Sequence, residues 1–263
     1  MYIKQLKLLL LKSIFVMILC SISSCSYGKD SLEKQTKQAY ELFKNDQYDK
    51  CIELCDNVLK INKSFYQAHI NKGKCLFMLK KYEQALDTYN NAIKIKPDSY
   101  EAYGAKGSVL YKLGKSKEAL IEYDLAIKIN PNYSKAYGAK GYIFQTLQMY
   151  QEALKEYEKE IKISPRSIDA YINKSAVLGK LERHQDALDN YNIALKYNPN
   201  DKYALYGKAV TLGKLGKQKE AGKIYTQLWD DKTIAEYKKE MEQERKKTKS
   251  SSTPPPNYTA KTK

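Results

Sequence analysis

Arginine is scarce in this sequence of 263 residues, and its shortage argues against one class of function. It occurs only at Arg166, Arg183 and Arg245, so lysine supplies nearly all of the basic charge. The formal net charge is +16, but acidic residues are interleaved with the lysines over the body of the chain. Proteins that read nucleic acids usually place arginine against the bases and gather basic residues on one face. We therefore expect no nucleic-acid partner.

Catalytic signatures are also missing. The only histidines are His69 and His184, and the sequence has no HExxH pair, no GxSxG elbow and no glycine-rich phosphate loop. We therefore expect a protein that is not an enzyme and has no cofactor, no metal and no small-molecule substrate.

The apolar run near the amino terminus is too short to cross a membrane. Lys4, Lys7 and Lys12 precede it, and it extends from Ser13 to Cys20. This is the layout of a secretory signal peptide, which we place at residues 1–24. Two alternatives stay open. One is an uncleaved anchor over residues 6–22, which Lys7 and Lys12 inside that stretch oppose; the other is simple cleavage to a secreted protein.

The end of this signal, Ile22-Ser23-Ser24-Cys25, resembles the bacterial lipobox. That resemblance implies that Cys25 carries the lipid, with residues 25–31 as a tether. Two or more acyl chains hold a protein stably on a membrane. We therefore expect an exported protein that is lipid-anchored to the cell envelope.

Four prolines at an interval of 34 residues dominate the rest of the chain. Pro97, Pro131, Pro165 and Pro199 close the phrases AIKIKP, AIKINP, EIKISP and ALKYNP. A fixed period of this length predicts stacked copies of one unit, each a pair of helices joined by a tight turn. With the proline at position 32, the repeats are 32–65, 66–99, 100–133, 134–167, 168–201 and 202–235.

The same residue types recur within each repeat. Position 8 is small, position 20 is alanine and position 24 is tyrosine in the regular repeats. The position-8 residues are Gly73, Gly107, Gly141, Ser175 and Ala209, and the position-24 residues are Tyr89, Tyr123, Tyr157, Tyr191 and Tyr225. We expect the small residues to let the two helices of a pair approach closely, and the tyrosines to fill the space between units.

This pattern resembles the tetratricopeptide repeat (TPR) family. The resemblance implies an all-α, right-handed superhelix of about six units, with the first helix of each pair, helix A, lining the concave wall. Ile234, Tyr237 and Met241 form one apolar stripe, which predicts a capping helix over residues 236–247. Residues 248–263 are too polar and proline-rich to fold alone.

In TPR proteins, certain helix A positions meet the ligand, so the resemblance also implies a groove for a protein or peptide partner. Its candidate residues are Asn71, Lys74, Phe77, Met78, Tyr111, Lys112, Lys135, Tyr142, Gln145, Asn173, Lys180 and Tyr206. The family's clamp for a terminal carboxylate is absent. We predict a membrane-anchored interaction scaffold of the bacterial envelope; the alternatives are a surface-exposed or secreted protein that engages host proteins, and a face that binds nothing tightly.

Position 7 departs from the family, because lysine replaces the usual leucine. These lysines are Lys72, Lys106, Lys140, Lys174 and Lys208. They could form a ladder of cations along the groove. We favour the alternative, in which the aliphatic stem packs and the ammonium group extends to solvent.

Three cysteines remain after the signal: Cys51, Cys55 and Cys75. Core packing as small apolar thiols is the reading we favour. A disulfide from Cys75 to Cys51 or Cys55 is open to an exported protein, and the family's geometry favours Cys51–Cys75. A metal site with His69 is the third alternative, but the usual CxxC pairing is absent.

Overall fold

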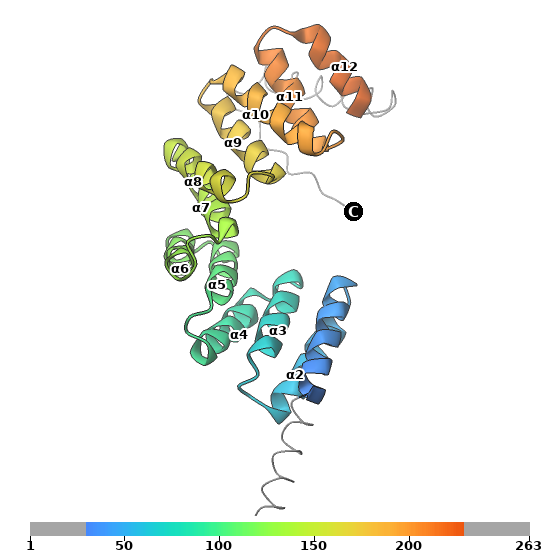
Figure 1. Cartoon of the computed structure of the whole chain (residues 1–263), viewed down its shortest axis with the longest axis vertical. Coiled ribbons are helices and arrows are strands. Elements are labelled where there is room, and N and C mark those ends of the chain that lie inside the picture. Colours follow the sequence, from blue (N-terminus) through green and yellow to red (C-terminus); the bar gives the residue numbers. More distant parts are fainter. Residues whose placement is uncertain (1–29, 229–263) are drawn as a thin grey trace, which may run out of the picture. The chain divides into compact units, whose positions relative to one another are not determined.

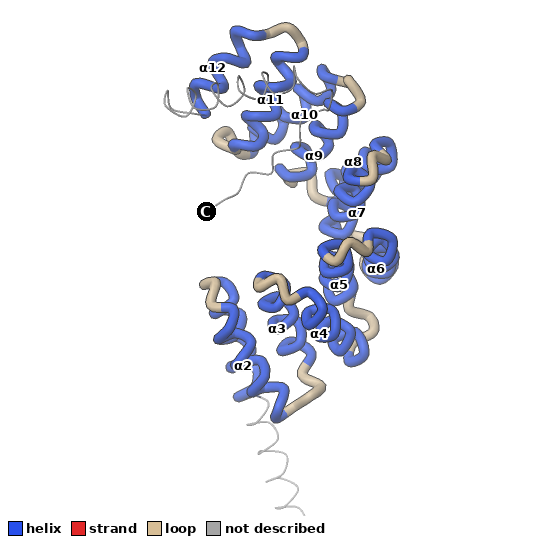
Figure 2. Tube along the Cα trace, turned by 180° about the vertical axis from the view of Figure 1, so that it is seen from behind, coloured by secondary structure: helices blue, strands red, loops and turns tan. Residues whose placement is uncertain are grey.

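The computed structural model describes residues 30–228, and every regular element in that range is an α-helix (Figures 1 and 2). A helix over residues 30–44 comes first. The helices that follow are α2 (Tyr48–Ile61), α3 (Tyr66–Met78), α4 (Tyr82–Ile95), α5 (Tyr100–Lys112), α6 (Ser116–Ile129), α7 (Ser134–Thr146), α8 (Tyr150–Ile163), α9 (Ile168–Lys180), α10 (His184–Tyr197), α11 (Lys202–Lys214) and α12 (Gln218–Leu228). The predicted signal peptide, Cys25, the capping helix and the tail lie outside the described residues.

The helices follow one another as helix–turn–helix pairs, as the 34-residue period predicts. Helices α3, α5, α7, α9 and α11 are the A helices, and α2, α4, α6, α8 and α10 are B helices of 14 residues each. The all-α fold predicted from the sequence is confirmed.

The turn inside each pair places position 15 in the left-handed region of backbone space. This residue is glycine at Gly114 and Gly216, where φ is +78° and +76°. Elsewhere an ordinary side chain takes the same conformation, with φ between 58° and 60° at Asp46, Lys80, Gln148 and Glu182. Left-handed backbone costs an L-residue about 1–2 kcal/mol, so the packing of each pair must maintain these turns.

The junction between repeats is set by an N-cap at position 34. The side chains of Ser99, Ser167 and Asp201 accept a hydrogen bond from the backbone N–H three residues later. Such caps satisfy a donor that the first helical turn leaves open. Together with the proline two residues earlier, the cap fixes where α5, α9 and α11 begin.

The core of the repeats is built on the position-24 tyrosines. Tyr89, Tyr123, Tyr157 and Tyr191 are buried. A methyl group added at Gly73 would stand 2.6 Å from the ring of Tyr89, and one at Gly107 would stand 3.1 Å from Tyr123. Position 8 is therefore small because the tyrosine of the same repeat occupies the space that a side chain would need.

The chain divides within α7, between Ile143 and Phe144, into two compact units. In the first unit, α3 contacts α5, and in the second, α9 contacts α11. No contact between successive B helices is recorded among the described elements of either unit. Within each unit the A helices are therefore the more closely spaced row, as on the inner side of a locally curved stack.

Candidate functional site

The A helices of the first unit carry an aromatic pair in which one ring is exposed and the other is half-buried. Tyr111 of α5 and Tyr142 of α7 meet edge to face, with ring centroids 5.7 Å apart. Tyr142 is 45% exposed, and Met78 at the end of α3 is 48% exposed. Edge-to-face pairs hold their rings in a fixed orientation, so this pair offers a preorganised apolar contact to a partner.

The same A helices also carry exposed lysines. Lys112 and Lys135 are exposed, and Phe77 lies half-buried against Tyr82, with ring centroids 5.6 Å apart. We call Lys74, Phe77, Met78, Tyr111, Lys112, Lys135 and Tyr142 the first A-face. Its side chains combine apolar contacts with positive charge.

Lys74 has the most perturbed environment on the first A-face. Its ammonium lies 5.6 Å from the ring centroid of Tyr40, over the ring face. Desolvation lowers the pKa of Lys74; Glu101 opposes this change and Lys135 adds to it. Such a group loses less hydration when an acidic partner arrives, which favours it as an anchor for a carboxylate.

Tyr40 is a residue that the sequence analysis missed. It is 41% exposed, and both Lys44 and Lys74 lie over its ring. The first repeat lacks the family's signature residues, so no groove residue was predicted in it. Tyr40 nevertheless occupies position 9, as Lys74 and Tyr142 do, and the 34-residue register could have found it.

Asn71 was predicted to lie in the groove, but the structure buries it, with 1% of its surface exposed. Its side-chain amide donates to the carbonyl oxygen of Thr36 at 3.0 Å, and its oxygen accepts from Gln67 at 3.0 Å. Asn71 therefore joins the first two repeats and is not available to a ligand. Gly104 is also a packing residue, because an added methyl group would stand 2.6 Å from the ring of Tyr133.

The candidate residues of the second unit are more scattered. Tyr206 is 43% exposed and its ring centroid lies 6.3 Å from that of Tyr225. Gln145 accepts a hydrogen bond from the Tyr157 hydroxyl at 2.9 Å. Asn173 is half-buried and Lys180 is exposed. No contact between any two of these four predicted residues is recorded in the described part of the chain.

Four of the five position-7 lysines form ion pairs with acidic side chains of helix B. Three of them pair with an acid 16 residues earlier, on helix B of the preceding repeat: Lys72 with Asp56 at 2.5 Å, Lys140 with Asp124 at 2.7 Å and Lys174 with Glu158 at 3.0 Å. Lys106 pairs instead with Glu122 of its own repeat at 2.8 Å. The favoured interpretation, with the ammonium groups extending to solvent, is therefore wrong for these four residues.

Sequence explains why the ion pairs differ. The residue 16 positions before Lys106 is Asn90, and that before Lys208 is Asn192, so neither lysine has an acid there. Lys106 finds Glu122 on the other side, whereas the matching position for Lys208 is Ile224. Within the described residues Lys208 has no ion pair. The position-7 lysines mainly link helices and do not build a ligand surface.

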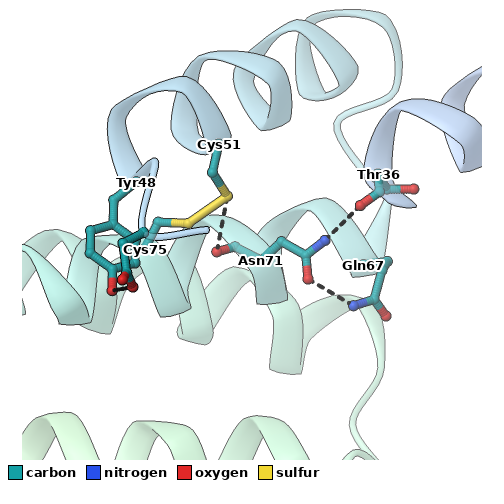
Figure 3. The surroundings of a disulfide bond; sticks show 7 residues. Thr36, Tyr48, Cys51, Gln67, Asn71 and Cys75 are labelled. Atoms are coloured by element: carbon teal, nitrogen blue, oxygen red, sulfur yellow. Dashed lines mark hydrogen bonds between the residues drawn. A yellow bond between two sulfur atoms is a disulfide. The ribbon is translucent and has the colours of Figure 1, made fainter. Parts of the chain in front are cut away.

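A disulfide joins Cys51 of α2 to Cys75 of α3, with their Cα atoms 6.8 Å apart (Figure 3). Cys55 stays a free, buried thiol, and burial raises its pKa to about 12. A thiol of that kind is unreactive at neutral pH. Core packing therefore describes Cys55, whereas Cys51 and Cys75 form the pair that the family's geometry favoured. No group of three metal-binding side chains occurs in the described range.

The fold and this exposed face define a class of protein: a helical repeat module that presents side chains from successive A helices to a partner. None of the helices described is long and apolar enough to cross a bilayer. Models of the tetratricopeptide repeat match residues 66–99, 100–133, 134–167 and 176–231, which is more than half of the chain. The chain belongs to the tetratricopeptide repeat family.

Solved TPR structures resemble the chain over most of its length. PilW, described as a widely conserved type IV pilus biogenesis factor, has a TM-score of 0.70 at 19% identity, with 76% of this chain and 93% of PilW covered. Pseudomonas aeruginosa PilF has a TM-score of 0.69 at 14% identity, covering 76% and 91%. YrrB, described as a TPR protein with an unusual peptide-binding site, has a TM-score of 0.52 at 23% identity, covering 66% and 90%. No curated protein sequence matches the chain.

Proposed function

We propose that the protein is a lipid-anchored scaffold of the bacterial envelope that holds a peptide segment of a partner protein on the first A-face. The observation that supports this most directly is the Tyr111–Tyr142 pair, with Tyr142 exposed, on the row of A helices that also carries Lys74, Lys112 and Lys135. Aromatic anchors with a polar rim are typical of binding surfaces. A single contact of this size supports micromolar affinity, about −8 kcal/mol.

The chemistry of the face favours a segment with an apolar or aromatic side chain next to an acidic group. The tyrosine pair would contact the apolar side chain, and the flanking ammonium groups would attract the acid. The TPR protein YrrB, to which the chain is similar, is described as having a peptide-binding site, and PilW as a factor in pilus biogenesis. The description of YrrB supports peptide binding, and that of PilW supports a role in an envelope setting.

The test is crosslinking followed by affinity capture from membranes, comparing wild type with Tyr111→Ala/Tyr142→Ala. A matched control is Ile121→Ala/Leu125→Ala, which removes two exposed apolar side chains from helix B of one repeat. We expect the tyrosine variant to lose its specific partners and the control to keep them. Capture that survives in the tyrosine variant would exclude the first A-face as the binding surface.

Anchoring rests on the sequence Ile22-Ser23-Ser24-Cys25. Cells fed labelled palmitate should incorporate it into the wild type and not into Cys25→Ala, and the variant should leave the membrane fraction. An unlabelled wild type that fractionates like Cys25→Ala would reject the lipid anchor. Rapid protease cleavage on intact cells would favour the surface-exposed alternative that engages host proteins.

A further inference from the structure

A pocket of about 390 Å³ lies away from the first A-face, where α2 ends, α3 begins and α4 ends. It is lined by Leu59, Lys63, His69, Asn91, Lys94 and Ile95. Its size is within the range of small-ligand sites. The proposed function assigns no role to it.

The residues around the pocket differ at three places from those in and just before the repeat 168–201, since His69 stands for Tyr171, Ile95 for Tyr197 and Lys63 for Pro165. Position 4 of helix A is His69 in the repeat 66–99, whereas three of the other repeats have tyrosine there. In the repeat 168–201, the Tyr171 hydroxyl donates to the Pro165 carbonyl at 3.3 Å, and its ring lies 6.3 Å from that of Tyr197 at position 30. The Tyr171 ring therefore lies beside the ring at position 30 of helix B.

His69 makes the equivalent hydrogen bond with a shorter side chain. Its Nε2 lies 2.9 Å from the carbonyl oxygen of Lys63, which occupies the position of Pro165. Because a carbonyl oxygen only accepts, Nε2 must carry the proton. The imidazole ring makes this hydrogen bond to the backbone but is shorter than a tyrosine side chain. Ile95, at the position of Tyr197, lines an open pocket beside it. The histidine itself is 8% exposed.

The charge in this pocket is positive and unbalanced. Lys63 and Lys94 enter no ion pair with any described residue, in contrast to the lysines at position 7, and no acidic side chain lines the pocket. Leu59 and Ile95 provide apolar walls, and the exposed Asn91 adds a side-chain amide. Ammonium groups beside aliphatic walls complement a molecule with an anionic head and a short apolar body.

We propose that this pocket binds a small amphipathic carboxylate, with its aliphatic chain against Leu59 and Ile95 and its carboxylate between Lys63 and Lys94. The site depends on His69 at a position where three other repeats carry tyrosine and one carries Leu205. The pocket is formed by the repeats 32–65 and 66–99 and shares no lining residue with the first A-face.

Octanoate is the probe, titrated into the purified protein by calorimetry below its micellar concentration. Acetate, which lacks the chain, and 1-octanol, which lacks the charge, are the matched comparisons. We expect saturable one-to-one binding of octanoate and at least tenfold weaker binding of the other two. Equal binding of octanoate and 1-octanol would show a non-specific apolar surface and overturn the proposal.

The decisive variant is His69→Tyr, which installs the residue that the chain uses at this position in three of its other repeats. We expect at least a tenfold loss of octanoate affinity with unchanged helical circular dichroism. Lys94→Ala should weaken binding several-fold, whereas Lys128→Ala, at position 29 of the next repeat where Tyr103 occupies position 4, should not. If the His69→Tyr protein folds and binds octanoate with unchanged affinity, the site is refuted. If this variant misfolds, equal changes of octanoate affinity in Lys94→Ala and Lys128→Ala refute the site.

Discussion

Reduction of the Cys51–Cys75 disulfide should release the first pair of helices from the stack. The bond closes a loop between residues 24 apart in sequence. In the chain-entropy description, a loop of about 25 residues stabilises the folded state by about 3.5 kcal/mol at 25 °C. The first repeat depends on this contribution, because buried Cys55 takes the position that a tyrosine fills in every later repeat.

The loss should be local, because repeats contact only their neighbours. The helix over residues 30–44 and α2 would retain the hydrogen bond from Asn71 to Thr36 and a small core around Val58. Opening of these two helices should therefore become easier by a factor of a few hundred, since 1.4 kcal/mol corresponds to a factor of ten. The protection of α5 and α6 should change little.

Hydrogen exchange read out by mass spectrometry measures this directly. The oxidised wild type is compared with the reduced wild type and with Cys51→Ser/Cys75→Ser, and Cys55→Ala serves as a control that keeps the disulfide. We expect reduction and the double substitution to accelerate exchange in α2, while the control has a smaller effect. Unchanged exchange in α2 on reduction, or free thiols at Cys51 and Cys75 in the non-reduced protein, would refute the reasoning.

Three further predictions concern the repeat geometry. Gly114→Ala should lower the free energy of unfolding by about 1 kcal/mol, because φ there is +78°; no atom lies within 4 Å of the added methyl group, so this backbone strain is the whole effect. Gly222→Ala, in open space inside α12, should raise the free energy of unfolding by a similar amount. Urea unfolding measures both changes, and changes of the same sign would contradict this account. A double-mutant cycle with Lys174→Met and Glu158→Gln should give a coupling energy of about 0.5–1 kcal/mol for this ion pair. The coupling energy should decrease as salt is added, because the Glu158 side chain is 58% exposed. A coupling energy that salt does not change would indicate another origin. Burial raises the pKa of Tyr191 to about 12, above the value of about 10 of an unfolded tyrosine. The stability that the neutral Tyr191 hydroxyl contributes is therefore complete below pH 10 and is lost as the pH rises toward 12. Tyr191→Phe should make the free energy of unfolding depend less on pH between 10 and 12, and an unchanged slope there would contradict this prediction.

The repeat register transferred well from sequence to structure wherever one repeat contains both partners of a contact. Gly73 with Tyr89 and Gly107 with Tyr123 are examples, because the small residue and the large ring lie 16 positions apart on the two helices of one pair. The family resemblance also led to the pairing of Cys51 with Cys75, since it relates helix B of one repeat to helix A of the next. Asn71 was misassigned because its position matches a ligand-binding one, whereas the divergent first repeat places Thr36 against it.

The sequence by itself determined the period, the helix pairs and the residue types that pack between them, because these depend on spacings that every repeat shares. Only the tertiary structure decided what depends on neighbours from different repeats. It showed that Lys72, Lys140 and Lys174 bind acids on the preceding repeat, because a distance of 16 residues across a repeat boundary becomes a direct contact only after stacking. It also showed that His69 leaves a pocket, because the space that a side chain fills depends on the helices around it.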